Sequence, residues 1–171
     1  MALPPRRPPG LSLGEVMAAK HHKPVVVISS SQKAVRVPRK RIVELVDFIS
    51  RREGERIGSA DIAFVDSDDM ASMNRRWLDH RGPTDVLSFD MGKDEAAPGI
   101  SAQLVICGPV AAKQAKDRGL DVQYEILLYV THVLLHLMGY EDHTIRGGAR
   151  MHAREEELLR EFLKSGKRGR P

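Results

Sequence analysis

Short β-branched runs and helical stripes of apolar residues alternate along most of this chain. The strand-like runs are each four residues long and are bounded by polar or turn-forming residues, as short buried strands are. They lie at residues 25–28, 62–65, 86–89 and 104–107. The pattern therefore predicts four short strands that are separated by other structure.

Between these runs, apolar residues recur at the i, i+3, i+4, i+7 spacing of amphipathic helices. One stripe runs from Ile42 to Ile49, and Pro38 near its start and Gly54 past its end are residues typical of helix boundaries. Later helices are predicted at about residues 110–118, 122–138 and 145–162. The inner face of the last helix is predicted to carry Met151, Leu158, Leu159 and Phe162.

A further helix is predicted after the second strand. Ser67 offers an N-cap there, and the inner face of this helix would be Met70, Met73 and Trp77. Four strands and four or five helices in mixed order predict an α+β fold, in which a mixed four-stranded sheet packs against helices. The long apolar helix at 122–138 would be central to this fold.

Length and composition favour a single folded domain with flexible ends. The chain has 171 residues, of which 42% are hydrophobic, and this is enough for a core of its own. Residues 1–23 are rich in proline and basic residues and lack periodicity, so we predict a flexible segment there. Residues 24–163 form the predicted domain, and residues 164–171 form a basic flexible tail.

Cysteine usage and hydropathy bear on the compartment. Cys107 is the only cysteine and lies in an apolar run, so we interpret it as a core residue and expect no intrachain disulfide. A single cysteine favours a reducing, intracellular setting. The N-terminus lacks the apolar stretch of a signal peptide, and no apolar run approaches the 18 residues that span a bilayer. We therefore expect a soluble cytoplasmic protein with no membrane partner.

The net charge of +4 is concentrated at the two ends of the chain. Four basic residues and one acid give residues 1–23 a net charge of +3, and four basic residues without an acid give residues 164–171 a charge of +4. Basic flexible ends suit a protein that meets a polyanion such as RNA, because attraction to phosphate needs positive charge but no fold. The alternative is that these ends only keep the chain soluble.

The apolar helix at 122–138 also carries the residues of a candidate metal site. His132 and His136 stand four residues apart, so their imidazoles project from one helical face with Cβ atoms about 5–6 Å apart. Gly139 ends the helix and can fold the following residues back, which delivers Asp142 and His143. Three protein ligands would leave one position of a tetrahedral ion open, which is the arrangement of a catalytic zinc.

Two other interpretations of these histidines stay open. Both could be core residues bonded to backbone carbonyls, although an apolar environment is costly for imidazoles without partners. A metalloprotease motif also spaces two histidines by four, but its catalytic glutamate follows the first one, and Val133 stands there. Glu125, two helical turns before His132, is placed to fix a ligand histidine by a hydrogen bond; a solvated residue in the first helical turn is the alternative.

Two separated motifs resemble one known family. The segments Thr-His-Val-Leu-Leu-His-Leu-Met-Gly-Tyr at 131–140 and Pro-Thr-Asp-Val-Leu-Ser-Phe at 83–89 are similar to those of the YbeY family, which are bacterial metal-dependent endoribonucleases. The resemblance runs from about residue 62 to residue 162. It implies zinc or a similar divalent ion, single-stranded RNA as substrate, a role in maturation of the small-subunit ribosomal RNA 3′ end and in ribosome quality control, and contact with the ribosome or its proteins.

The chain departs from the family pattern at three places, one of which is Ala102-Gln103, where family members often have Gly-Asp. The family spacing His, three residues, His, five residues, His puts Asp142 at the third ligand position and His143 one place late. We therefore predict Asp142 as the third ligand, with His143 as the alternative. Leu78 stands where the family tends to have an arginine. The candidates for contacting RNA instead are Arg75, Arg76 and Arg81, and Arg76 and Glu125 are the candidates for a catalytic role beyond the metal site.

Two rival functions remain at this point. The same histidines could serve a zinc-dependent peptidase or another metallohydrolase, or they could hold a structural metal in a non-catalytic, ribosome-associated protein. A nuclease should have a cleft rimmed by arginine and lysine, whereas a structural metal should be enclosed by four protein ligands.

Overall fold

The computed structural model describes residues 22–78, 82, 84–92 and 98–168, and within them the chain forms one four-stranded sheet. The strands are β1 (Val25–Ser30), β2 (Ile57–Val65), β3 (Val86–Asp90) and β4 (Ile100–Cys107). Their order is β1-β2-β4-β3, in which β1, β2 and β4 are parallel and β3 is antiparallel to β4. The mixed sheet predicted from the sequence is confirmed.

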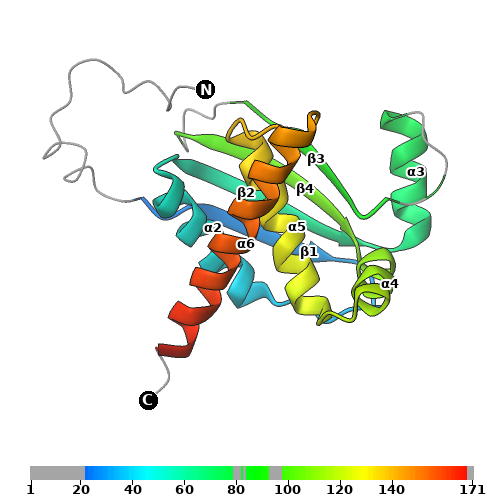
Figure 1. The fold of residues 1–171 in the computed structure, drawn as a ribbon. Helices are drawn as coiled ribbons and strands as arrows, with labels where there is room; N and C mark the ends of the chain where they lie inside the picture. Colours follow the sequence, from blue (N-terminus) through cyan, green and yellow to red (C-terminus); the bar gives the residue numbers. More distant parts are fainter. Residues whose placement is uncertain (1–21, 79–81, 83, 93–97, 169–171) are drawn as a thin grey trace, which may run out of the picture.

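Five helices accompany the sheet in the described residues. They are α2 (Arg39–Glu53), α3 (Ser67–Trp77), α4 (Gly108–Arg118), α5 (Val122–Leu137) and α6 (Ile145–Arg168). Helices α2, α5 and α6 lie together over one face of the sheet, and α3 stands apart from them at the β3 side (Figure 1). The order of elements and their packing confirm the predicted α+β fold.

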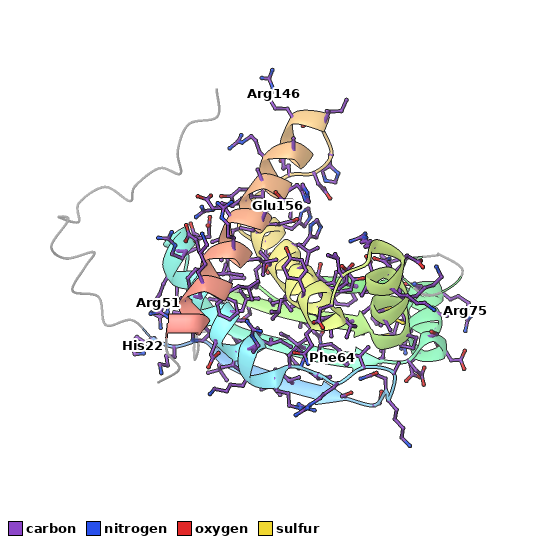
Figure 2. The ribbon with its side chains drawn as sticks, turned by 60° about the horizontal axis from the view of Figure 1, so that its bottom comes forward. His22, Arg51, Phe64, Arg75, Arg146 and Glu156 are labelled. Carbon is purple, nitrogen blue, oxygen red and sulfur yellow. The ribbon has the colours of Figure 1, made fainter. Side chains whose placement is uncertain are left out.

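Strand residues alternate between two apolar clusters, because successive side chains of a strand point to opposite faces. On β2, Ile62 and Phe64 enter the main core under α2, α5 and α6, where Phe64 is labelled in Figure 2. Val65 instead joins a smaller cluster with Met70 of α3 and Cys107 of β4. Each fully buried large side chain contributes about 1.5–3 kcal/mol. The prediction that Cys107 is a core residue is confirmed.

Helix α5 is central to the main core. Asp121 caps it by accepting hydrogen bonds from the backbone N–H groups of Gln123 and Tyr124 at 2.8 and 3.2 Å. Most of its side chains are buried, and its neighbours are α2, α4, α6, β3 and β4. None of the described helices is both long and apolar enough to cross a membrane.

The prediction for α3 was wrong in two respects. Asp66, not Ser67, is the N-cap, because its carboxylate accepts from the backbone N–H of Asp69 at 2.9 Å. Trp77 is 60% exposed, because it lies in the last turn of the helix at the edge of the small cluster. Asn74 is buried instead, and its amide donates to the carbonyl of Gly82 at 2.6 Å.

Several element boundaries extend beyond their predicted positions. β2 and β4 start several residues earlier than the apolar runs, because their first halves mix small and polar residues such as Ser59, which bonds Ser101 across the sheet at 2.9 Å. α6 continues to Arg168, into the segment predicted as a flexible tail, and in this extension the hydroxyl of Ser165 donates to the carbonyl of Phe162 at 2.8 Å. Residues 1–21 and 169–171 lie outside the described residues, so the predicted domain limits stay a prediction.

Candidate metal centre and cleft

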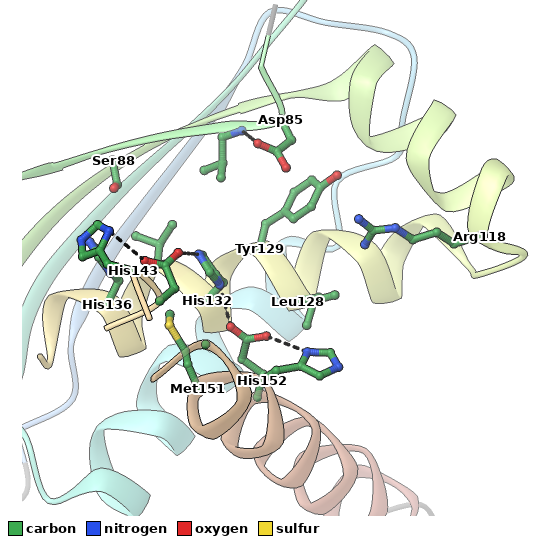
Figure 3. A pocket seen from close by; sticks show the side chains of 15 residues that line it. Asp85, Ser88, Arg118, Leu128, Tyr129, His132, His136, His143, Met151 and His152 are labelled. Atoms are coloured by element: carbon green, nitrogen blue, oxygen red, sulfur yellow. Dashed lines mark hydrogen bonds and ion pairs between the residues drawn. The ribbon is translucent and has the colours of Figure 1, made fainter. Parts of the chain in front are cut away.

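A cleft of about 740 Å³ lies between α5, the start of β3 and the first half of α6 (Figure 3). It is on the face of the sheet that carries the main core, because Val86 and Ser88 of β3 line it, whereas Leu87 points to the smaller cluster. The ionisable lining residues are Asp85, Arg118, Tyr129, His132, His136, Asp142, His143, His152 and Glu155. All four residues predicted as metal ligands thus meet in one cleft.

The elbow after α5 has the predicted geometry. Gly139 has a φ of 94°, in the left-handed region that favours glycine. The backbone N–H of Tyr140 donates back to the carbonyl of Leu135 at 3.0 Å, and this bond closes the helix end. The chain therefore reverses within a few residues, and Asp142 and His143 return to the face of α5 that carries the histidines.

His132 is the best-fixed member of the group. Its Nδ1 lies 2.6 Å from Oε1 of Glu155 on α6, so the ring donates its Nδ1–H to that carboxylate. This hydrogen bond raises the pKa of His132 above its usual value, although burial of the ring opposes the rise. The opposite nitrogen, Nε2, is left to face the cleft. It lies 4.0 Å from Oδ2 of Asp142.

The separation between His132 and Asp142 suits a shared ion. Two ligands of a tetrahedral zinc, each about 2.0–2.2 Å from the ion, are about 3.3–3.6 Å apart. The measured 4.0 Å between Nε2 and Oδ2 is slightly longer, and both side chains are about two-fifths exposed, so a small side-chain rotation closes the difference. An imidazole held at Nδ1 by a carboxylate is the usual support of a zinc ligand. These two residues therefore fit a zinc ion.

His136 and His143 complete the group less tightly. Their ring centroids are 6.2 Å apart, and Nδ1 of His143 lies 3.8 Å from Oδ1 of Asp142. Across the described residues, no three His, Cys, Asp or Glu side chains converge closely enough to hold an ion as they stand. Both histidines are exposed, and they line the same cleft as the His132 and Asp142 pair.

Sequence reasoning missed Glu155 and His152. Glu155 is 5% exposed, and its second oxygen lies 3.5 Å from Nδ1 of His152. A signal was present in the sequence, because Glu155 stands four residues after Met151 and three before Leu158, on the buried stripe of α6. A carboxylate at such a position needs a partner. That partner is His132.

We expect Glu155→Gln to weaken zinc binding by about tenfold. Carboxylates that orient a ligand histidine are worth about 10–100-fold in metal affinity, and glutamine keeps the shape of the side chain but not its charge. Competition with a chromogenic chelator measures the dissociation constant. Glu156→Gln is the matched control, since Glu156 is exposed and contacts His152 only at its outer nitrogen. Equal zinc affinity in both variants would remove the orienting role of Glu155.

The comparison with known proteins bears directly on this cleft. The family model described as "Endoribonuclease YbeY" matches residues 27–163, which covers every strand but the first two residues of β1 and both sides of the cleft. The chain belongs to the YbeY family. The resemblance inferred from the two motifs is confirmed.

Named relatives agree with this assignment. The chain is 40% identical over 109 residues to "Endoribonuclease YbeY" of Beutenbergia cavernae, and the aligned region covers 60% of this chain and 73% of the relative. It is 34% identical over 143 residues to the protein of the same name from Acidothermus cellulolyticus, which spans 76% and 87% of the two chains. Among solved structures, the solution structure of TM1509 from Thermotoga maritima matches with a TM-score of 0.59 at 18% identity, over 84% of this chain and 92% of that one. That match supports the fold.

In this YbeY-family chain, none of the hydrogen bonds or ion pairs of the described residues joins Glu125 to a histidine of the cleft. It is 0% exposed, so the alternative of a solvated residue was wrong. Its Oε1 accepts from Nη1 of Arg118 at 2.9 Å. The support that Glu125 was predicted to give His132 comes from Glu155 on α6. A catalytic role for Glu125 stays a prediction.

The arginines predicted to bind RNA lie away from the described lining of the cleft. Arg75 and Arg76 stand in the last turn of α3, which packs on the opposite face of the sheet, and Arg75 projects outward in Figure 2. The guanidinium of Arg76 lies 5.4 Å from the ring centroid of Trp77. Arg81 lies outside the described residues. RNA binding by these three residues stays a prediction.

Proposed function

We propose that this chain is a metal-dependent endoribonuclease that cleaves single-stranded RNA. One observation carries the proposal: in a chain of the YbeY family, Nε2 of His132 and a carboxylate oxygen of Asp142 face each other 4.0 Å apart inside an open cleft. Relatives named "Endoribonuclease YbeY" support the reaction. We assign ribosomal RNA as the substrate, with processing of the small-subunit 3′ end and ribosome quality control as its roles, in the cytoplasm and in contact with the ribosome.

We assign one zinc ion to His132, His136 and Asp142, with His143 as the alternative third ligand. Zinc held by three such ligands supplies a Lewis acid for the phosphoryl oxygen and lowers the pKa of bound water. The protein's part is to hold the donors. Glu155 fixes the His132 ring through Nδ1 so that Nε2 faces the cleft, and the Gly139 elbow holds Asp142 against it.

The opposite end of the cleft offers groups for an RNA strand. Burial raises the pKa of Tyr129 above its usual value, and its protonated hydroxyl donates to Oε1 of Gln114 at 2.9 Å. Asp85 uses Oδ1 to accept from the backbone N–H of Val86 at 2.8 Å. A carboxylate has further acceptor sites, so Asp85 can accept a hydrogen bond from a ribose hydroxyl.

The rival functions have less support. A peptidase would need the glutamate of the metalloprotease motif, and Val133 stands in its place. The described lining holds three carboxylates and one arginine, so the rim of arginine and lysine expected of a nuclease is not seen there, and membership of the YbeY family is what favours RNA. A purely structural metal needs four enclosing ligands, whereas His136, Asp142 and His143 are all exposed. An open site favours catalysis.

The test is cleavage of matched RNA substrates by the zinc-loaded protein. We expect an unstructured oligoribonucleotide to be cut at least about tenfold faster than the same strand in a duplex, because freeing bases from a duplex costs a few kcal/mol and about 1.4 kcal/mol corresponds to tenfold. Gel analysis of end-labelled RNA gives both rates, and the His136→Ala protein, purified in the same way, controls for contaminating ribonuclease. Cleavage of a peptide library without cleavage of RNA would favour the peptidase.

A further inference from the structure

The cleft is lined by more carboxylates than cationic side chains. Three carboxylates line it, on Asp85, Asp142 and Glu155, whereas Arg118 is the single arginine or lysine in the lining that the structure describes. A polyanionic strand is held by cations that neutralise its phosphates. Apart from a bound ion, Arg118 is therefore the one described group of the lining that supplies a permanent positive charge.

One side of the Arg118 guanidinium is bound to a buried carboxylate, and the other side is exposed. It is the last residue of α4, and its Nη1 donates to Oε1 of Glu125 at 2.9 Å. Glu125 is 0% exposed, whereas the Arg118 side chain is 52% exposed. The other oxygen of Glu125, Oε2, is buried and has no hydrogen-bond partner among the described residues. The buried carboxylate therefore fixes the guanidinium at the wall of the cleft.

The geometry leaves most of the guanidinium free for a ligand. A guanidinium carries five N–H donors in a fork that matches phosphate oxygens, and the ion pair with Glu125 uses one nitrogen. Figure 3 shows the Arg118 side chain reaching toward Tyr129 and the interior of the cleft. Glu125 and His132 are seven residues apart on α5, which is about 10 Å along the helix axis. Arg118 thus sits beyond the metal centre, at the far end of the same cleft.

We propose that Arg118, held in place by Glu125, binds a backbone phosphate of the RNA strand that neighbours the phosphate being cleaved. This inference rests on the proposed function. Because Arg118 contacts a neighbouring phosphate, it acts mainly on substrate binding. Its loss should raise KM by about tenfold, the size of one charge-assisted hydrogen bond, and change kcat by less than about twofold to threefold.

The variants must separate substrate binding from folding. Arg118→Gln alone leaves the buried Glu125 carboxylate without its cation, which destabilises a protein. The double variant Arg118→Gln with Glu125→Gln keeps a neutral hydrogen-bonded pair and removes the positive charge of Arg118 together with the buried negative charge of Glu125. The single variant Glu125→Gln, measured beside it, gives the effect of losing the carboxylate alone. Lys113→Gln is the matched control, since Lys113 lies on the same helix and forms an exposed pair with Asp117 at 2.6 Å. Thermal unfolding verifies that each protein is folded at the assay temperature.

The experiment measures kcat, KM and the salt dependence of binding for a single-stranded oligoribonucleotide. We expect the double variant to raise KM about tenfold and to reduce the slope of log K against log salt by about 0.7, the contribution of one phosphate contact on a single strand. Lys113→Gln should match the wild type. If the wild type cleaves RNA and the folded double variant keeps its KM and salt slope, the role of Arg118 is overturned while the nuclease stands. A wild type that neither binds nor cleaves RNA overturns the proposed function itself.

Discussion

His136→Ala is expected to lower RNA cleavage by at least about 100-fold and to leave the fold intact. Supporting carboxylates around a metal ligand are worth about 10–100-fold, so loss of a ligand itself should cost more. His136 lies in the last turn of α5 and is exposed, and so it contributes little to the core. This variant should therefore lose activity while keeping its thermal stability, whereas substitution of a buried residue would lower both.

The measurement is the single-turnover cleavage rate of an unstructured oligoribonucleotide, together with zinc content and the thermal unfolding midpoint. Wild-type protein stripped by a chelator should lose activity and regain it when zinc is added back, whereas His136→Ala should not be rescued by the same zinc concentration. His22→Ala is the control for loss of an exposed histidine, since His22 lies just before β1, and Figure 2 shows it apart from α5. Full activity in both the stripped protein and His136→Ala would rule out metal-assisted cleavage at this site.

The fold was predictable because its elements are marked locally. Each strand contains a run of apolar residues, and the α2 stripe from Ile42 to Ile49 is buried as its spacing required. The α6 residues predicted to point inward, Met151, Leu158, Leu159 and Phe162, are all buried. The periods of 2 and 3.6 residues carry this information without any knowledge of neighbours. The failure at Trp77 shows the limit, because periodicity identifies a face but not how far along it the core extends.

The histidine pair and the elbow were also local features. A spacing of four residues on one helix and a glycine with positive φ are properties of the chain itself, so His132, His136, Asp142 and His143 could be grouped from the sequence. Their exact mutual distances depend on side-chain rotation and on the ion.

The partners of this group could not be predicted in the same way. Glu155 reaches His132 from a helix 23 residues further on, and this contact exists only because α6 packs across α5. The pair of Arg118 and Glu125 likewise depends on the turn between α4 and α5. The sequence placed Glu125 on the correct helix but assigned it to the wrong neighbour, because two residues on one face need not touch when another helix offers a closer partner.

The second large effect is expected at the third ligand. Asp142→Ala should reduce cleavage by at least about 100-fold, the same loss as expected for the ligand His136. His143→Ala should reduce it by less than about tenfold. Oδ2 of Asp142 faces Nε2 of His132 at 4.0 Å, and the carboxylate is 43% exposed. His143 is 78% exposed, and its Nδ1 lies near the other carboxylate oxygen, at 3.8 Å. His143 is thus placed to orient Asp142 from the solvent side.

Cleavage rates and zinc dissociation constants of the two variants decide between these ligands. Glu141→Ala is the matched control, because it removes an exposed carboxylate next to Asp142 on the same elbow. Zinc affinity should fall in Asp142→Ala together with activity, since a ligand contributes to both. The reverse pattern, in which His143→Ala loses activity and Asp142→Ala keeps it, would make His143 the ligand and would require the elbow to shift by one residue when the ion binds. Wild-type activity in both variants would contradict a third ligand on the elbow. The turn at Gly139 contributes to the metal site only if Asp142 or His143 binds the ion.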